Sequence, residues 1–153
     1  HIEKAAGNRH GYSRLPEYMT EWYDGFTTIF ERYARIEQKG SILNRLIRSF
    51  KAYLSGVTGN LEKANNDFYS LTRTEKEEKT DPYFHLYYFL YAKILQKSGE
   101  HAIDDSLTIL NKALKQLQER ASYIEEPHDR PRYLFNNYWN NLVFSEAKKK
   151  NLI

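Results

Sequence analysis

Residues 83–92, with the sequence YFHLYYFLYA, are apolar or aromatic at every position except His85. A run of this kind is either a buried strand or a helix that is buried on every side. The apolar pattern continues through Ile94 and Leu95, which makes the segment too long for an ordinary buried strand. We therefore expect a helix that other helices enclose, and the rest of the chain must supply those neighbours.

Five further segments carry apolar residues at the three- and four-residue spacing of amphipathic helices. They lie at residues 16–40, 41–56, 60–71, 103–124 and 133–147. Pro16, Ser41, Asn60 and Asp81 belong to the residue types favoured at helix starts, and Gly40 is a natural helix stop. Because no pair of strands is recognisable, the predicted fold class is all-α with about six helices.

The remaining segments set the expected boundaries. Residues 1–15 show no periodicity and are expected to form a poorly ordered lead-in to a single domain at residues 16–153. The charged run at 74–80 is expected to be a solvated loop or a frayed helix end, and the run at 125–131 a charged loop. Since the chain starts at His1, we expect it to be a fragment of a longer protein.

Charge and cysteine content argue against several function classes. The 23 basic and 20 acidic residues are spread evenly, so the basic face of a nucleic-acid-binding domain is not indicated. The densest basic run, at residues 148–150, is typical of a helix C-terminus. The absence of cysteine excludes disulfides, zinc-thiolate sites and thiol nucleophiles. No apolar run approaches the length of about 18 residues, so we expect no membrane insertion in this segment.

The sequence offers little for catalysis or metal binding. None of the 5 histidines lies at ligand spacing from another on a helix. Glu125, Glu126, His128 and Asp129 are a conceivable metal or acid–base cluster, but a solvated loop is the favoured interpretation of these charges. We therefore expect no metal, no cofactor and no enzymatic activity, and the compartment and oligomeric state stay open, with the cytoplasm favoured over the periplasm or the cell exterior.

Two helix-turn-helix units repeat within the chain. Ala52 and Ala92 are equivalent, as are Gly59 and Gly99, and the members of each pair lie 40 residues apart. Together with the segment GNLEKA at 59–64 and Phe68, this pattern resembles the tetratricopeptide repeat. In that family small side chains lie where two helices approach most closely. The resemblance covers about residues 41–150 and implies antiparallel helix pairs in a right-handed superhelical stack; an irregular helical bundle is the alternative.

The resemblance also implies a function. The first helices of successive units line a concave groove in which the family binds peptides or protein segments, so the expected activity is non-catalytic protein interaction or scaffolding. The groove residues implied by the resemblance are Ser49, Tyr53, Phe89, Lys93, Lys97, Asn137, Asn140, Asn141 and Lys148. The alternative function is a helical sensory or small-ligand-binding domain in which the aromatic segment 83–92 lines a pocket.

Overall fold

The computed structural model describes residues 42–153, and every element in that range is helical. The predicted all-α class is therefore confirmed for these residues, which contain no strand. The predicted lead-in at 1–15 and the predicted helix at 16–40 lie outside the described residues. The chain divides into two units, residues 1–71 and 72–153. The single domain expected at 16–153 stays a prediction.

The first unit contains an antiparallel helix pair, α3 (Ile42–Val57) and α4 (Leu61–Thr72). The boundary between the units falls just before the last residue of α4, Thr72, which is assigned to the second unit. The backbone N–H of Asn60 donates to the carbonyl of Ser55 at 2.9 Å, and Gly59 has a φ of 119°. This is the Schellman ending, in which a glycine in the left-handed region turns the chain. The Asn60 side chain then caps α4 by accepting the Lys63 N–H at 3.2 Å, as the sequence predicts.

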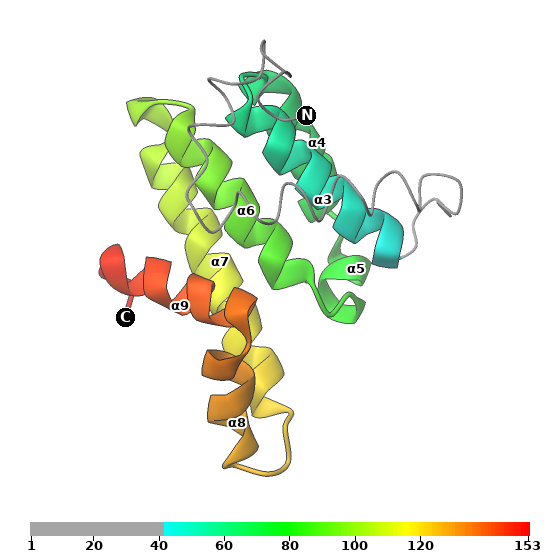
Figure 1. Cartoon of the computed structure of the whole chain (residues 1–153), viewed down its shortest axis with the longest axis vertical. Helices are drawn as coiled ribbons and strands as arrows, with labels where there is room; N and C mark the ends of the chain where they lie inside the picture. The colour runs from blue at the N-terminus through cyan, green and yellow to red at the C-terminus, as the bar shows by residue number, and fades with distance from the viewer. Residues whose placement is uncertain (1–41) are drawn as a thin grey trace, which may run out of the picture. The chain divides into compact units, whose positions relative to one another are not determined.

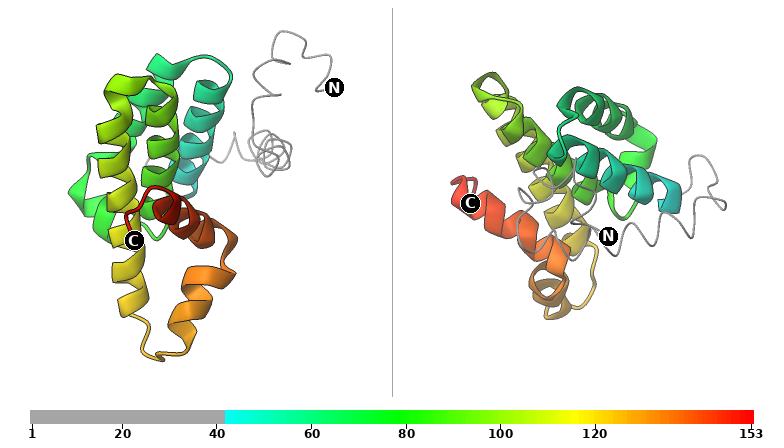
Figure 2. Two further views of the ribbon diagram at one scale, coloured as in Figure 1. Left: turned by 90° about the vertical axis from the view of Figure 1, so that its left-hand side faces the viewer. Right: turned by 45° about the horizontal axis from the view of Figure 1, so that its top comes forward.

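The second unit is built on another helix pair, α6 (Phe84–Lys97) and α7 (Ile103–Ser122), joined through the short 3₁₀ helix η2 (Glu100–Ala102). Residues 84–90 of α6 are all buried, which confirms that this helix has no solvent-facing side over its first two turns. A third helix, α9 (Tyr138–Lys149), packs against both α6 and α7, as Figures 1 and 2 show. The buried helix therefore has α7 and α9 as neighbours within its own unit.

The close approach expected between paired helices is present in the second unit. Ala92 is fully buried in α6, and the Ser106 hydroxyl of α7 donates to the Ala92 carbonyl at 3.0 Å. A larger side chain at either position would push the two helices apart. Gly99, which follows α6, has a φ of 114° and so matches Gly59 in the first unit. Both turns thus contain a glycine at positive φ, 40 residues apart, while the repeat and its superhelical stack stay predictions.

Residues 74–80 differ from the prediction of a loop or frayed end. They contain a separate helix, α5 (Glu75–Thr80), which begins with acidic residues as the helix dipole favours. Two side chains of α7 donate to its backbone: the Gln116 amide reaches the Glu78 carbonyl at 3.0 Å, and the Arg120 guanidinium reaches the same oxygen at 3.4 Å. Tertiary contact therefore stabilises a segment that charge patterning alone predicts to be loop.

The predicted helix at 133–147 is interrupted. Asn137 has extended backbone angles, φ −80° and ψ 121°, and separates α9 from the preceding π-helix η3 (Arg132–Asn136). The predicted loop at 125–131 is shorter than expected, because α8 (Asp129–Pro131) already begins the turn that leads into η3. Pro131 fits there because the first turn of a helix needs no N–H from it. Both differences come from local backbone chemistry around prolines and asparagines.

The two turn glycines generate a stability prediction. At Gly99, with φ 114° and ψ 174°, an added Cβ lies 3.1 Å from the His101 ring, whereas at Gly59 nothing lies within 4 Å. We expect Gly59→Ala to lower the free energy of unfolding by about 1 kcal/mol through the backbone alone, and Gly99→Ala by about 2 kcal/mol or more. Urea unfolding measures both. Equal losses at the two positions would contradict the added contact with His101.

Candidate functional site

The nine predicted groove residues have different environments. Ser49, Tyr53, Phe89 and Asn140 are buried, Lys93 is partly buried, and Lys97, Asn137, Asn141 and Lys148 are exposed. Ser49 and Tyr53 belong to the first unit and the other seven to the second, and each unit is described by itself. The four buried side chains contribute to packing and do not form an accessible surface. An accessible binding surface among the predicted residues is therefore restricted to the exposed members.

Lys93 joins α6 to α9. Its ammonium lies 3.4 Å from the Glu146 carboxylate, and the Gln96 amide donates to the same carboxylate at 3.4 Å. The side chains of this ion pair are only 18% and 11% exposed, for Lys93 and Glu146 respectively, so water screens the pair less than it would on an open surface. Lys93 therefore contributes to helix packing and is already paired within the chain.

Asn140 forms a second buried connection between α6 and α9. Its amide nitrogen donates to the Tyr133 carbonyl at 2.8 Å, so its oxygen is the atom that faces His85 Nε2, also at 2.8 Å. An amide oxygen only accepts, and His85 therefore carries its proton on Nε2. The other ring nitrogen, Nδ1, is buried and has no hydrogen-bond partner among the described residues. The network fixes both the tautomer of His85 and the position of α9.

The environment of His85 opposes its protonation. Burial in the aromatic helix lowers the pKa of His85 from 6.5 to about 4, and the charge of Arg120 acts in the same direction. The hydrogen bond to Asn140 and the charge of Asp81 oppose this shift without cancelling it. A charged ring would also leave a buried Nδ1–H without an acceptor. His85 is therefore a neutral structural histidine at neutral pH.

Asn137 begins α9. Its side-chain oxygen accepts the N–H groups of Trp139 at 3.1 Å and Asn140 at 3.2 Å. This is an N-cap, which satisfies backbone donors that the first helical turn leaves unpaired. Asn137 was expected to face a partner, and its position explains why asparagines occur in this helical region: one caps the helix and one, Asn140, is buried in the network.

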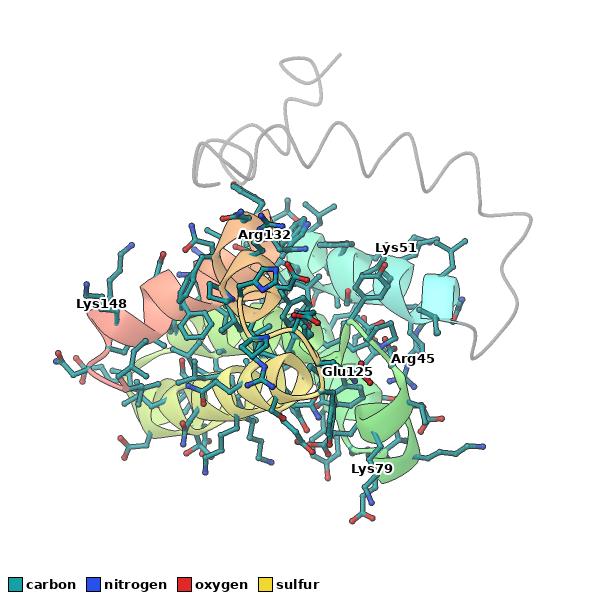
Figure 3. All side chains as sticks on the ribbon, turned by 90° about the horizontal axis from the view of Figure 1, so that it is seen from below. Arg45, Lys51, Lys79, Glu125, Arg132 and Lys148 are labelled. Carbon is teal, nitrogen blue, oxygen red and sulfur yellow. The ribbon has the colours of Figure 1, made fainter. Side chains whose placement is uncertain are left out.

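The buried residues of α9 show which side of the helix faces outward. With 3.6 residues per turn, the buried residues Asn140, Val143, Glu146 and Ala147 occupy one side of the helix. The opposite side, here named the α9 face, consists of Tyr138, Asn141, Ser145, Lys148 and Lys149, all of which are exposed. Figure 3 shows Lys148 projecting from the end of α9. Of the predicted groove residues, Asn141 and Lys148 lie together on this face.

Two half-exposed aromatic side chains lie on or near α9. Tyr138 is 48% exposed and contacts the Trp139 ring with the ring centroids 5.8 Å apart. Phe135 of η3 is 50% exposed and packs on Phe144 at 5.1 Å. Sequence reasoning missed Tyr138 and Phe135 because it treated 133–147 as one continuous helix. The sequence signal for the start of α9 at Tyr138 is the asparagine pair before it, since asparagine favours N-caps.

The C-terminal end of α9 is cationic. Asn151, with a φ of 57°, ends the helix, and the Leu152 N–H donates to the Ala147 carbonyl at 2.9 Å. Lys148, Lys149 and Lys150 are exposed, and none of them forms an ion pair within residues 42–153. The only acidic residue of α9, Glu146, is turned inward to Lys93. The α9 face is therefore aromatic at one end and positively charged at the other.

A separate cleft of about 310 Å³ lies between α5 and the C-terminal half of α7. It is lined by Glu78, Lys79, Gln116, Glu119, Arg120 and Tyr123. Its two acidic and two basic side chains balance, and the aromatic side chains of α6 do not line it. This cleft therefore does not correspond to the aromatic ligand pocket considered as the alternative function.

Within residues 42–153, no group of three or more His, Asp or Glu side chains is arranged to hold a metal ion. No helix in the same range has the length and apolar character needed to cross a bilayer. His128 lies near Glu126 and Asp129, at 3.7 and 3.5 Å, on an exposed turn.

Residues 31–151 match the model of a family named TP_0123_C, which is described as a C-terminal domain. No curated protein and no solved structure matches the chain.

The His85 network generates a pH prediction. Because its pKa is lower in the folded chain than the usual 6.5, the unfolded chain binds the proton first as the pH falls. The stability associated with neutral His85 is present above pH 6.5 and is lost as the pH falls to about 4, a total of about 3 kcal/mol. Urea unfolding across this range, compared with His85→Leu, isolates the effect. Parallel pH profiles for the two chains would contradict it.

The N-cap generates a second prediction. Asn137→Ala removes the acceptor of two backbone N–H groups and is expected to lower the free energy of unfolding by about 1 kcal/mol. Asn137→Asp keeps an acceptor and is expected to retain most of that stability. Thermal unfolding of the three chains measures the difference. If alanine and aspartate have the same effect, Asn137 does not stabilise the start of α9 through its side chain.

Proposed function

The chain belongs to the TP_0123_C family, and we propose that it is a non-catalytic interaction module that binds a peptide or protein segment on the α9 face. The observation that carries the proposal is the composition of this surface. Tyr138 is about half exposed, and exposed amide and ammonium groups follow at Asn141 and Lys148. Phe135 of η3 adds a second half-exposed aromatic side chain, which packs on Phe144. Exposed aromatic residues next to adaptable polar ones are common in protein-binding surfaces.

The support beneath this surface favours binding without rearrangement. Asn140 and Glu146, on the inner side of α9, hold the helix to α6 through His85 and Lys93. A surface that is already ordered loses less conformational entropy when a partner binds. The resemblance to the tetratricopeptide repeat supports the same class of function, because that family binds protein segments along the first helix of each repeat. Since α9 follows the second helix pair, it takes the place of the first helix of a third repeat.

The competing functions have less support. A small-ligand domain needs an enclosed apolar pocket, and the cleft between α5 and α7 has a charged lining. An enzyme needs reacting groups placed near one another, and the buried histidine of α6 is held neutral and out of reach of solvent. Protein interaction therefore accounts for the exposed aromatic and amide groups with the fewest additional assumptions.

A capture experiment tests the proposal. The chain is immobilised, a lysate of the organism that encodes it is passed over it, and retained proteins are identified by mass spectrometry. We expect a retained protein to be lost, by tenfold or more, from Tyr138→Ala/Asn141→Ala, since truncating central contact residues commonly costs about 1 to 2 kcal/mol each.

The matched control is Tyr83→Ala/Gln118→Ala, which removes an exposed tyrosine and an exposed amide from other parts of the second unit. Circular dichroism checks that both variants keep the native helical content. If the α9 variant and the control retain the same proteins in the same amounts as the native chain, the α9 face is not the binding surface.

A further inference from the structure

We propose that the α9 face selects an extended acidic peptide segment, with an apolar side chain of the segment at the Tyr138 end and its carboxylates at the Lys148 and Lys149 end. This inference rests on the proposed function and names the chemistry of the partner. It is carried by three observations: the uncompensated charge at one end of the face, the polar groups in its middle, and the fixed length between its ends.

The charge at the C-terminal end of α9 lacks a partner within the described chain. Lys148, Lys149 and Lys150 are exposed and unpaired in residues 42–153, while Glu146 is turned inward to Lys93. The negative end of the helix dipole offsets about half of one charge. Two or more positive charges are therefore available to an acidic partner, and charge complementarity of this kind guides both specificity and association.

The middle of the face favours main-chain recognition. Asn141 and Ser145 are exposed one turn apart between the aromatic and cationic ends. An asparagine amide and a serine hydroxyl each both donate and accept hydrogen bonds. A helical partner has already used its own N–H and C=O groups internally, whereas an extended segment presents them to such side chains. The expected partner is therefore extended over this stretch.

The length of α9 sets the spacing within the partner. Tyr138 and Lys148 are ten residues apart on one helix, which corresponds to about 15 Å along its axis. An extended chain advances about 3.3 Å per residue. The apolar side chain and the first carboxylate of the partner are accordingly expected to lie about four or five residues apart.

Peptide selection tests this inference. A display library of random 12-residue peptides is selected on the full chain at low salt, and the strongest binders are synthesised. We expect enrichment of Asp and Glu at the stated spacing from an apolar residue. Binding by fluorescence anisotropy is expected to weaken about tenfold in Lys148→Glu/Lys149→Glu and to weaken as sodium chloride is added.

Two further variants keep the result interpretable. Lys112→Glu/Lys115→Glu reverses two exposed charges on α7 and is expected to leave binding unchanged. Lys148→Gln/Lys149→Gln removes the charge without placing acids at the helix C-terminus and is expected to give an intermediate loss. Circular dichroism verifies the helical content of each variant.

The outcomes separate this inference from the function on which it rests. Selected peptides that need Tyr138 but show no acidic enrichment and no loss in Lys148→Glu/Lys149→Glu overturn the acidic partner while the interaction function stands. Failure to select any peptide that depends on the α9 face, together with a capture result insensitive to Tyr138→Ala/Asn141→Ala, overturns both. A mixed-sequence single-stranded oligonucleotide that binds more tightly than the peptides, through the same lysines, overturns the peptide in favour of nucleic acid.

Discussion

The buried hydrogen bond between His85 and Asn140 is the interaction on which the placement of α9, and with it the α9 face, depends. It joins the aromatic helix α6 to α9 at 2.8 Å, and the second amide bond of Asn140, to the Tyr133 carbonyl, adds the segment before α9. Breaking such a bond leaves two buried polar groups unpaired, which costs more than the bond itself contributes. The same network turns Asn140 inward and thereby leaves Tyr138 and Asn141 facing out.

The helical framework was predictable because its information is local. The three- and four-residue spacing of apolar side chains identified α3, α4, α6 and α7, and the continuous apolar segment at 83–92 identified the enclosed helix. Asn60 and Gly59 also acted as their residue types predict, as a cap and as a left-handed turn. Where the chemistry of a single residue determines the local backbone conformation, the sequence is sufficient to predict that conformation.

The candidate surface was predictable only in part, because it depends on contacts between distant residues. Lys93 and Asn140 have the residue types of a peptide-binding groove, but Glu146 and His85 engage them inside the unit. Asn137 interrupts a helix that periodicity alone predicts to be continuous, and Tyr138, the first residue after the break, is exposed. The helix α5 likewise depends on Gln116, which lies 38 residues away in the sequence.

Asparagines terminate α9 at both ends, Asn137 as its cap and Asn151 as its left-handed exit. The chemistry of its own boundaries therefore sets both ends of the helix. The helix holds its aromatic end and its cationic end at a fixed distance from each other. Each residue inserted between Asn141 and Ser145 would rotate the lysines by about 100° around the helix axis. The arrangement of the α9 face therefore tolerates changes of side chain far better than changes of helix length.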